Sequence, residues 1–316
     1  MSTLPSDLMI PAGTFMGVPQ AGEVRPGQGV ILGIPFDCGT HPTRIGARQG
    51  PRAIREQSGL VRPVLPELGD RDIIVAMDVA DLGDVAVVSS EVAPALAAIE
   101  AALGHLMERG AYPVTFGGDG LVTLPQLRAV HRRYPDLVVL HVDAHTDAYE
   151  SPGYTTSTTF SRAADVERPR DVDDFLFGGA RSFHIGARGT LMAPGAYDHA
   201  RALGYNLILG ADVRTRGVAD VVAEVRRTVG SRPVYLCFDM DYIDPSAAPG
   251  VCTPTWGGPP AVEALELLHA LEGLHIVATD INTVSPPHDV GGMTASLAAH
   301  VAVVALNLMY LGRNAR

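Results

Sequence analysis

Cysteine is scarce in this chain, and its scarcity bears on the cellular compartment. The 316 residues include three cysteines, Cys38, Cys237 and Cys252, and no two of them form a Cys-x-x-Cys pair. So few and so widely spaced thiols cannot build the disulfide framework of a small secreted domain. We therefore expect reduced thiols, as in a cytoplasmic protein.

Positive charge and long apolar runs are also scarce. Lys and Arg number 24 against 35 Asp and Glu, which gives a formal net charge of −11. Such a protein repels phosphates, and the arginines form no basic stripe, so we expect no nucleic-acid partner. The N-terminus lacks the features of a signal peptide, and we find no segment with the roughly 18 uncharged apolar residues of a membrane span. These absences predict a soluble, cytoplasmic protein without a membrane partner.

The composition otherwise suits a large folded core, with 47% hydrophobic and 19% charged residues. Residues 1–28 are rich in Pro and Gly without periodicity, which predicts an irregular N-terminal arm that packs on this or a neighbouring subunit. No linker interrupts residues 29–316, so we expect one domain there. Strands are predicted at 30–34, 113–116, 137–142, 233–238 and 275–279. Helices are predicted at 51–57, 91–109, 121–133, 219–229, 261–271 and 292–309.

This alternation of strands and helices predicts an α/β fold, with a mainly parallel sheet covered by helices on both faces. Four of the predicted strands run into an aspartate, directly or after two glycines: Asp119, Asp143, Asp239 and Asp280. In open parallel sheets, ligands bind outside the carboxyl ends of the strands. We therefore expect these four acids to converge on one crevice.

Two of these strand ends carry further ligand-type side chains. Asp143, His145 and Asp147 occupy alternate positions, which point to one side of an extended segment, and Asp239 and Asp241 repeat the spacing. A single Asp after a strand is more often a turn former or a helix cap. Together these residues favour a metal site over a solvated acidic crevice, because burying that much negative charge without a cation is costly. Carboxylates and imidazole suit Mn²⁺, or a neighbour such as Ni²⁺ or Fe²⁺.

Three segments resemble the signature blocks of the ureohydrolase family of arginases and agmatinases, and they are nearest to agmatinases. They are Gly-Gly-Asp at 117–119, Asp-Ala-His-Thr-Asp at 143–147 and Phe-Asp-Met-Asp-Tyr-Ile-Asp-Pro-Ser-Ala-Ala-Pro-Gly at 238–250. Residues 34–37, 44–55 and 284–289 resemble further agmatinase loops, so the resemblance covers nearly the whole chain after the arm. It implies a three-layer arginase-like α/β fold, assembly into trimers or hexamers, a binuclear Mn²⁺ centre, and hydrolysis of a small guanidino substrate to urea and an amine.

The resemblance also implies roles for individual residues. Asp143 and Asp239 would bridge two ions, with His145 and Asp241 completing one position and Asp147 helping to complete the other. Asp147 would also be catalytic, because it would orient the attacking water that metal coordination activates. Two further acids, Asp119 and Asp244, are expected to accept hydrogen bonds and fix the orientation of the ligands.

Three positions depart from the family pattern. Gly120 stands where the family has a metal-binding His after Gly-Gly-Asp, so one ion loses its imidazole and one ion or two is an open question. Thr156 aligns with a His that relays protons, and threonine has no pKa useful for that task. Thr283 aligns with a Glu that holds the guanidinium, and a neutral hydroxyl cannot pair with that cation as a carboxylate does. His41 and His184 are candidates to supply the lost imidazole, although a lone His is more often an ordinary structural residue.

Three functions are compatible with this pattern. The first is a metal-dependent amidinohydrolase that cleaves a C–N bond of a non-standard guanidino or amidine-like compound. The second is a catalytically silent homologue that acts as a binding or regulatory subunit. The third is an ordinary agmatinase with a weakened metal site. Retention of five metal-ligand residues favours an enzyme over a silent scaffold.

Overall fold

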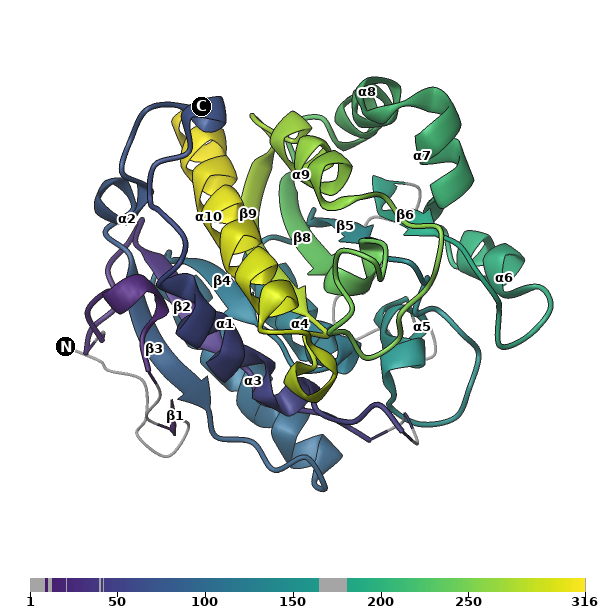
Figure 1. The fold of residues 1–316 in the computed structure, drawn as a ribbon, viewed down its shortest axis with the longest axis horizontal. Coiled ribbons are helices and arrows are strands. Elements are labelled where there is room, and N and C mark those ends of the chain that lie inside the picture. Colours follow the sequence, from purple (N-terminus) through teal and green to yellow (C-terminus); the bar gives the residue numbers. More distant parts are fainter. Residues whose placement is uncertain are drawn as a thin grey trace.

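The computed structural model describes residues 9–10, 13–20, 22–39, 41, 43–164 and 181–315, and these form one nine-stranded sheet between layers of helices (Figure 1). The strands are β1 (Met9–Ile10), β2 (Gly29–Gly33), β3 (Ala80–Val85), β4 (Tyr112–Phe116), β5 (Val138–Val142), β6 (Phe183–Ala187), β7 (Asn206–Leu209), β8 (Pro233–Asp239) and β9 (His275–Asn282). Their order across the sheet is β1-β3-β2-β4-β9-β8-β5-β6-β7. All neighbours pair in parallel except β1, which is antiparallel to β3, so the predicted mainly parallel sheet is confirmed.

The sequence pattern missed β1, β3, β6 and β7. Strand β3 (Ala-Asp-Leu-Gly-Asp-Val) carries two acids and a glycine, and β6 contains His184 and Gly186, so neither has a continuous apolar run. Strand β9 extends beyond the predicted end at Thr279, because Asp280 and Ile281 still pair with β4 and β8. Asp280 therefore lies inside the sheet, bonded to Thr123, and does not join the other strand-end acids in a crevice.

The α-helices are α1 (Gly50–Ser58), α2 (Ile73–Ala76), α3 (Val92–Glu108), α4 (Thr123–Arg133), α5 (Thr159–Ala163), α6 (Ala196–Ala202), α7 (Gly210–Arg216), α8 (Val218–Val229), α9 (Ala261–Ala270) and α10 (Met293–Asn314). The six predicted helices correspond to α1, α3, α4, α8, α9 and α10. The four that were missed have four to seven residues, too short for a clear helical period.

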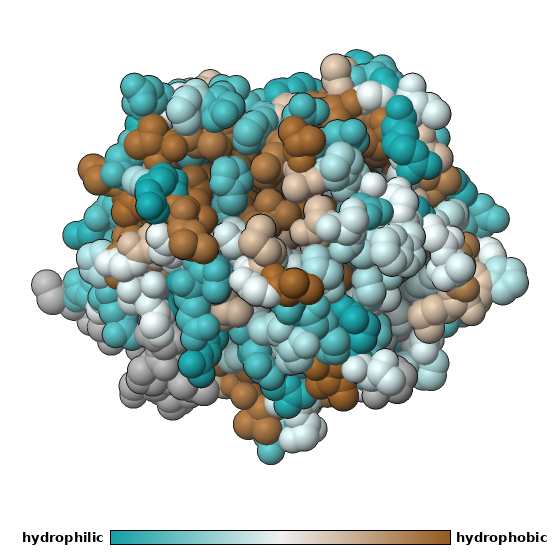
Figure 2. Space-filling view, viewed as in Figure 1, coloured by the Kyte–Doolittle hydropathy of each residue, from teal (hydrophilic) through white to brown (hydrophobic). Residues whose placement is uncertain are grey.

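Two hydrophobic clusters lie on opposite faces of the sheet, because alternate residues of each strand point to opposite sides. Leu140 and Val142 of β5 join a cluster with α1, α8, α9 and α10, while Val139 joins a cluster with α3, α4 and α5. The molecule is thus three layers thick. Figure 2 shows hydrophobic side chains on the face that carries α9 and α10, where Leu60, Leu265, Val290, Met293 and Leu297 line a groove.

The prediction that no segment has the length and apolar character of a membrane span was wrong for helix α10. Met293–Asn314 is long and apolar enough to cross a membrane by length and composition, with a window hydropathy of 1.6. However, 72% of that window is buried inside the fold, where α10 packs against β9 and α1. Core packing accounts for its apolar character.

The described part of the N-terminal arm is more regular than predicted and packs on its own sheet. Strand β1 pairs with β3, and a 3₁₀ turn (Phe15–Gly17) buries Phe15 against Phe116, with ring centroids 5.4 Å apart. The backbone N–H of Phe15 donates to Asp81 Oδ2 at 2.7 Å. Arg55 of α1 also binds Asp81, through Nε at 2.8 Å and Nη2 at 2.9 Å. This buried ion pair ties the arm, α1 and β3 together.

Candidate metal centre

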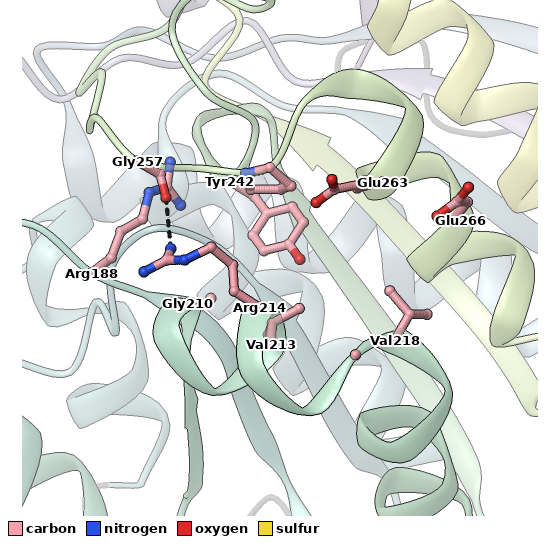
Figure 3. Close-up of a pocket in the computed structure, with 12 residues that line it drawn as sticks. Arg188, Gly210, Val213, Arg214, Val218, Tyr242, Gly257, Glu263 and Glu266 are labelled. Atoms are coloured by element: carbon pink, nitrogen blue, oxygen red, sulfur yellow. Dashed lines mark hydrogen bonds between the residues drawn. The ribbon is translucent and has the colours of Figure 1, made fainter.

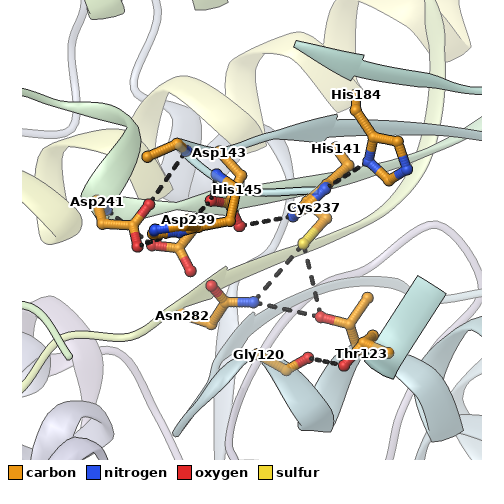
Figure 4. A network of polar contacts seen from close by, with 12 residues as sticks. Gly120, Thr123, His141, Asp143, His145, His184, Cys237, Asp239, Asp241 and Asn282 are labelled. Atoms are coloured by element: carbon orange, nitrogen blue, oxygen red, sulfur yellow. Dashed lines mark hydrogen bonds and ion pairs between the residues drawn. The ribbon is translucent and has the colours of Figure 1, made fainter. Parts of the chain in front are cut away.

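The predicted ligands lie at the carboxyl ends of strands at the centre of the sheet. Asp143 follows β5, and Asp239 is the last residue of its neighbour β8. Both form the same turn: Asp143 Oδ1 accepts the N–H of His145 at 2.5 Å, and Asp239 Oδ1 accepts the N–H of Asp241 at 2.7 Å. Such Asx turns bend the chain as it leaves the strand. Figure 4 shows how they bring His145 and Asp241 beside Asp143.

The first possible ligand group consists of Asp143, His145 and Asp241. One ligand atom of each lies within 4.8 Å of the others, and His145 Nδ1 is 3.2 Å from Asp143 Oδ1 and 3.1 Å from Asp241 Oδ2. The other ring nitrogen, Nε2, is 3.0 Å from the hydroxyl of Thr255, which itself donates to the carbonyl of Thr253 at 3.3 Å. In that arrangement the Thr255 hydroxyl accepts a hydrogen bond from Nε2–H. Nδ1 faces the carboxylates of Asp143 and Asp241; burial opposes protonation of the ring, but the charge of Asp241 and the hydrogen bonds with Asp143 and Asp241 outweigh it and raise the pKa of His145 well above its usual value. A metal ion bound to Nδ1 would take the place of this proton.

The second possible ligand group consists of His141, Asp143 and Asp147, again with ligand atoms within 4.8 Å of one another. It shares Asp143 with the first group. His141 lies on β5, with Nε2 2.7 Å from Asp143 Oδ2. The sequence prediction missed His141, although a residue two positions before Asp143 in a strand must point to the same side.

Asp239 and Thr283 meet at the same site. Asp239 is in neither three-residue group, but its Oδ1 accepts the hydroxyl of Thr283 at 2.5 Å in addition to the N–H of Asp241. Thr283 has φ of +66°, which β-branched residues rarely adopt, and its N–H donates to the carbonyl of Gly118 at 2.7 Å. These two bonds fix the Thr283 hydroxyl on the predicted bridging carboxylate.

Burial and mutual repulsion dominate the electrostatics of these acids. Burial and the negative charge of Asp143 raise the pKa of Asp147 well above its usual value, and burial with the charges of Asp241 and Asp143 does the same to the pKa of Asp239. At Asp143, the raising effect of burial is outweighed by attraction and hydrogen bonding from His141 and His145, which hold its pKa well below the usual value. Among the described residues, the ion pairs of this cluster are with histidine alone.

A divalent cation fits this arrangement. The four carboxylates of the cluster are 1–6% exposed and lack Lys or Arg partners in the described parts of the chain, so a cation would supply the positive charge that the site needs. His145 directs Nδ1 toward the same space. Carboxylate oxygen and imidazole nitrogen without thiolate match Mn²⁺, Ni²⁺ or Fe²⁺.

The structure explains what fills the space beside Gly120. A Cβ at position 120 would lie 2.9 Å from Asp147 Oδ2 and 2.9 Å from the Cγ2 methyl of Thr156. The two altered positions are therefore neighbours, and the Thr156 methyl occupies the space in front of Gly120. No side chain longer than hydrogen fits at 120 without movement.

In the described part of the chain, the two predicted supporting acids accept hydrogen bonds from backbone N–H groups, and Asp244 also from the Ser246 hydroxyl, but none from the ligand side chains. Asp119 accepts the N–H of Cys38 at 2.7 Å and of Leu121 at 3.1 Å, and burial raises its pKa to about 6. Asp244 accepts the N–H groups of Gly257 at 2.9 Å and Gly258 at 3.1 Å. Asp119 thus holds the segment that contains Gly120, whereas Asp244 holds the loop beyond Thr255.

Arg188, which follows β6, forms hydrogen bonds with the backbone of two residues of the site. Its Nη2 donates to the carbonyls of Asp241 at 2.8 Å and Thr255 at 2.7 Å. Arg188 also borders a separate cavity of about 300 Å³ between α7 and α9, with Arg214 on the same side (Figure 3). Asp241 and the hydrogen-bond partner of His145 are thereby tied to one guanidinium.

A cavity of about 440 Å³ opens onto the acidic cluster. Its floor consists of His145, Asp147, Asp239 and Asp241. Residues that carry a hydroxyl group make up much of the wall, namely Tyr149, Thr156, Ser157, Thr190, Thr253, Thr255 and Thr283, together with His41, Leu191, Met192, Cys252 and Pro254. Two of the three positions that depart from the family pattern, Thr156 and Thr283, therefore line the same cavity as the candidate metal ligands. The third, Gly120, lies behind Thr156.

Comparison with known proteins identifies the family to which this chain belongs. The arginase family pattern matches residues 28–307, which is most of the chain. The chain belongs to the arginase family. This confirms the resemblance to ureohydrolases and the predicted arginase-like fold, and it makes the chain an amidinohydrolase that acts on C–N bonds of guanidino compounds or other linear amidines.

The similar proteins are guanidino-compound hydrolases by name. The chain is 37% identical to guanidinopropionase of Pseudomonas aeruginosa over 292 residues, which cover 90% of this chain and 88% of that protein. It is 36% identical to the mitochondrial guanidino acid hydrolase of Homo sapiens, with coverage of 86% and 75%. The solved structure of proclavaminate amidinohydrolase from Streptomyces clavuligerus matches with a TM-score of 0.86 at 32% identity, covering 96% of this chain and 98% of that one.

Proposed function

We propose that this amidinohydrolase uses Mn²⁺, or Ni²⁺ or Fe²⁺ in its place, to hydrolyse a guanidino or amidine-like compound whose reacting group is less cationic than a plain guanidinium. The observation that carries the proposal is the hydrogen bond from the Thr283 hydroxyl to Asp239. Because that hydroxyl is donated to Asp239, Thr283 offers the substrate neither a negative charge nor a free proton.

The rest of the cavity supports the same conclusion. Apart from the acids of the cluster, the described lining residues include no Asp or Glu that could pair with a guanidinium. A charged hydrogen bond to such a cation contributes about 1.5–3 kcal/mol. Without it, a plain guanidinium loses an advantage over a less basic group, such as a guanidine that carries an electronegative substituent on nitrogen.

The chain's own residues have distinct tasks in this proposal. Asp143, His145, Asp239 and Asp241 hold the metal, which when bound acts as a Lewis acid and activates water. Asp147 faces the cavity, and its carboxylate, once ionised, can take a proton from the attacking water and hand it to the leaving nitrogen. The hydroxyl-rich wall positions the remainder of the substrate through hydrogen bonds.

The lining also bears on the tail of the substrate. Guanidinopropionase and guanidino acid hydrolase are named for substrates that carry a carboxylate. In this chain the described lining residues include no Lys or Arg to pair with such a group. This favours a tail that forms hydrogen bonds with Tyr149 and the Thr and Ser hydroxyls over one that forms an ion pair.

A substrate panel tests the proposal. Protein loaded with Mn²⁺, and separately with Ni²⁺ and Fe²⁺, would be assayed for urea and ammonia release from agmatine, arginine, guanidino acids, N-hydroxyguanidino compounds and amidines, with metal-free protein as the control. We expect metal-dependent turnover with a higher kcat/KM for the less basic groups. A higher kcat/KM for agmatine or arginine would identify an ordinary ureohydrolase instead. Strong metal binding without any turnover would identify a silent homologue.

Two further properties stay predictions. The family resemblance leads us to propose a homo-oligomer, trimeric or hexameric, and the scarce cysteines lead us to propose a cytoplasmic location. Sedimentation of the purified protein measures the first, and fractionation of its host cells measures the second.

A further inference from the structure

His141 is a buried imidazole that the proposed mechanism leaves without a task. It is 1% exposed, and its ring lies against Phe160 with centroids 4.1 Å apart, so its orientation is fixed by packing. It directs Nε2 toward Asp143 and Nδ1 toward His184, whose Nδ1 is 2.8 Å away (Figure 4). One nitrogen of this ring therefore faces the acidic cluster.

Asp147 provides a second and independent observation. Its side chain is 6% exposed, and no hydrogen bond or ion pair from the described residues reaches its carboxylate, whereas Asp143, Asp239 and Asp241 each accept at least one. Leaving a buried carboxylate without a partner is costly unless it binds something. The carboxylate lies beside Gly120, where a Cβ would be 2.9 Å from its Oδ2.

The two possible ligand groups have the form of two neighbouring cation positions. One group joins His145 and Asp241 to Asp143, and the other joins His141 and Asp147 to it, so Asp143 is common to both. Asp143 uses a different oxygen on each side, Oδ1 toward His145 and Oδ2 toward His141. A carboxylate that presents one oxygen to each side is suited to bridge two ions.

The geometry on the His141 side is compatible with coordination. Adjacent ligand atoms of an octahedral ion with bonds of about 2.1 Å lie about 3 Å apart. His141 Nε2 and Asp143 Oδ2 are 2.7 Å apart, and the Asp147 ligand atom lies within 4.8 Å of both. A cation at this position would replace the direct contact between Nε2 and Oδ2, while the contact between Nδ1 and His184 would remain.

Resting on the metal centre of the proposed function, we infer that His141 is the imidazole ligand of a second cation, held with Asp143 and Asp147. It supplies from β5 the imidazole that position 120 cannot, because Gly120 has no donor and the Thr156 methyl fills the space in front of it. The chain therefore retains a two-ion centre with a rearranged ligand set.

Metal binding by the full chain tests this inference, with Mn²⁺ as the probe. Free Mn²⁺ would be followed by electron paramagnetic resonance during titration of the wild type, His141→Gln and His184→Gln. Glutamine can keep a hydrogen bond to Asp143 but is a poor ligand. His184→Gln is the matched control, because it disturbs the same imidazole pair without touching Asp143. Circular dichroism would verify that each variant is folded.

The expected result is two Mn²⁺ per wild-type chain and a selective loss in His141→Gln. Removing a group that only supports a ligand weakens metal binding by about 10–100-fold. We expect His141→Gln to weaken one of the two ions by more than this and His184→Gln to retain both. A wild type that binds a single ion, or a His141→Gln variant whose two ions are weakened by 100-fold or less, overturns the inference. A wild type that binds no Mn²⁺, Ni²⁺ or Fe²⁺ overturns the proposed function itself.

X-ray absorption of the wild type gives a second measurement that does not depend on the folding of a variant. In a chain that the titration shows to bind two Mn²⁺, His141 and His145 together give one imidazole per ion on average. With His145 as the single imidazole, the average is one per two ions. The first value supports the inference and the second contradicts it.

Discussion

Substitution of Gly120 by Ala should disrupt the site through one methyl group. A Cβ at this position would lie 2.9 Å from both Asp147 Oδ2 and Thr156 Cγ2, closer than real Cβ contacts. Overpacking of this kind costs about 1–3 kcal/mol. In an unhindered helical turn the same change would stabilise the fold by about 0.4–1 kcal/mol. A net loss of stability therefore isolates the clash.

Thr156→Ser provides the matched partner for this substitution. It removes the Cγ2 methyl and keeps the hydroxyl, and the next nearest atom of residue 156, its Cβ, is 4.0 Å from the added carbon. We expect the double variant to recover part of the stability lost in Gly120→Ala, with a coupling of about 0.5–3 kcal/mol. The contact with Asp147 persists, so Mn²⁺ affinity should stay below that of the wild type.

The assay is urea unfolding of metal-free protein, followed by fluorescence and circular dichroism, for the wild type, both single variants and the double variant. Equal unfolding midpoints for Gly120→Ala and the wild type would refute the steric reasoning, as would purely additive effects in the double variant. The same geometry predicts that Gly120→His alone cannot restore the family's metal ligand. Room for that imidazole requires a smaller residue at position 156.

Three more outcomes follow from the site and its support. Thr255→Val should weaken Mn²⁺ binding by about 10–100-fold, because His145 Nε2 loses its acceptor, whereas Thr255→Ser should retain affinity in the same titration. Mn²⁺ affinity should rise with pH. Burial and neighbouring charge raise the pKa values of Asp147 and Asp239, so their protons must leave when the ion binds. Calorimetry in buffers of different ionisation enthalpy measures this proton release, and a pH-independent affinity would contradict the prediction. Arg55→Met should lower the free energy of unfolding by about 3–5 kcal/mol, since it strands the buried Asp81 carboxylate, and Arg55→Lys should cost less; equal losses would argue against the ion pair.

Much of the fold follows from local pattern, and the exceptions have physical causes. Long helices such as α3 and α10 and apolar strands such as β5 and β8 are readable because burial of one or both faces imposes a period. Strand β3 could not be predicted from its sequence, because its acids interrupt the apolar pattern. Those acids are neutralised by Arg55, which comes from a separate helix. Tertiary contacts of this kind leave no local signature.

The site was predictable to the extent that its residues follow strands closely in sequence. Asp143 and Asp239 were found because each ends a strand and begins a turn. The proximity of Gly120 to Thr156 could not be read, since it depends on two loops meeting. His141 was missed for a different reason: inside a strand a histidine has the pattern of a core residue. Its spacing of two residues from Asp143 is the signal that could have found it, and the contact of its imidazole with Asp143 confirms that direction.

The central claim is that Thr283 sets the preference for a less cationic reacting group. The most direct test is the ratio of kcat/KM for a plain guanidino compound to that for its N-hydroxy analogue, in wild type, Thr283→Glu and Thr283→Gln. Both variants lose the bond to Asp239, but only Glu adds a charge. We predict that Glu raises the ratio by about 10-fold or more, as a charged hydrogen bond of at least 1.5 kcal/mol requires, and that Gln does not. An equal ratio in the two variants would contradict the account.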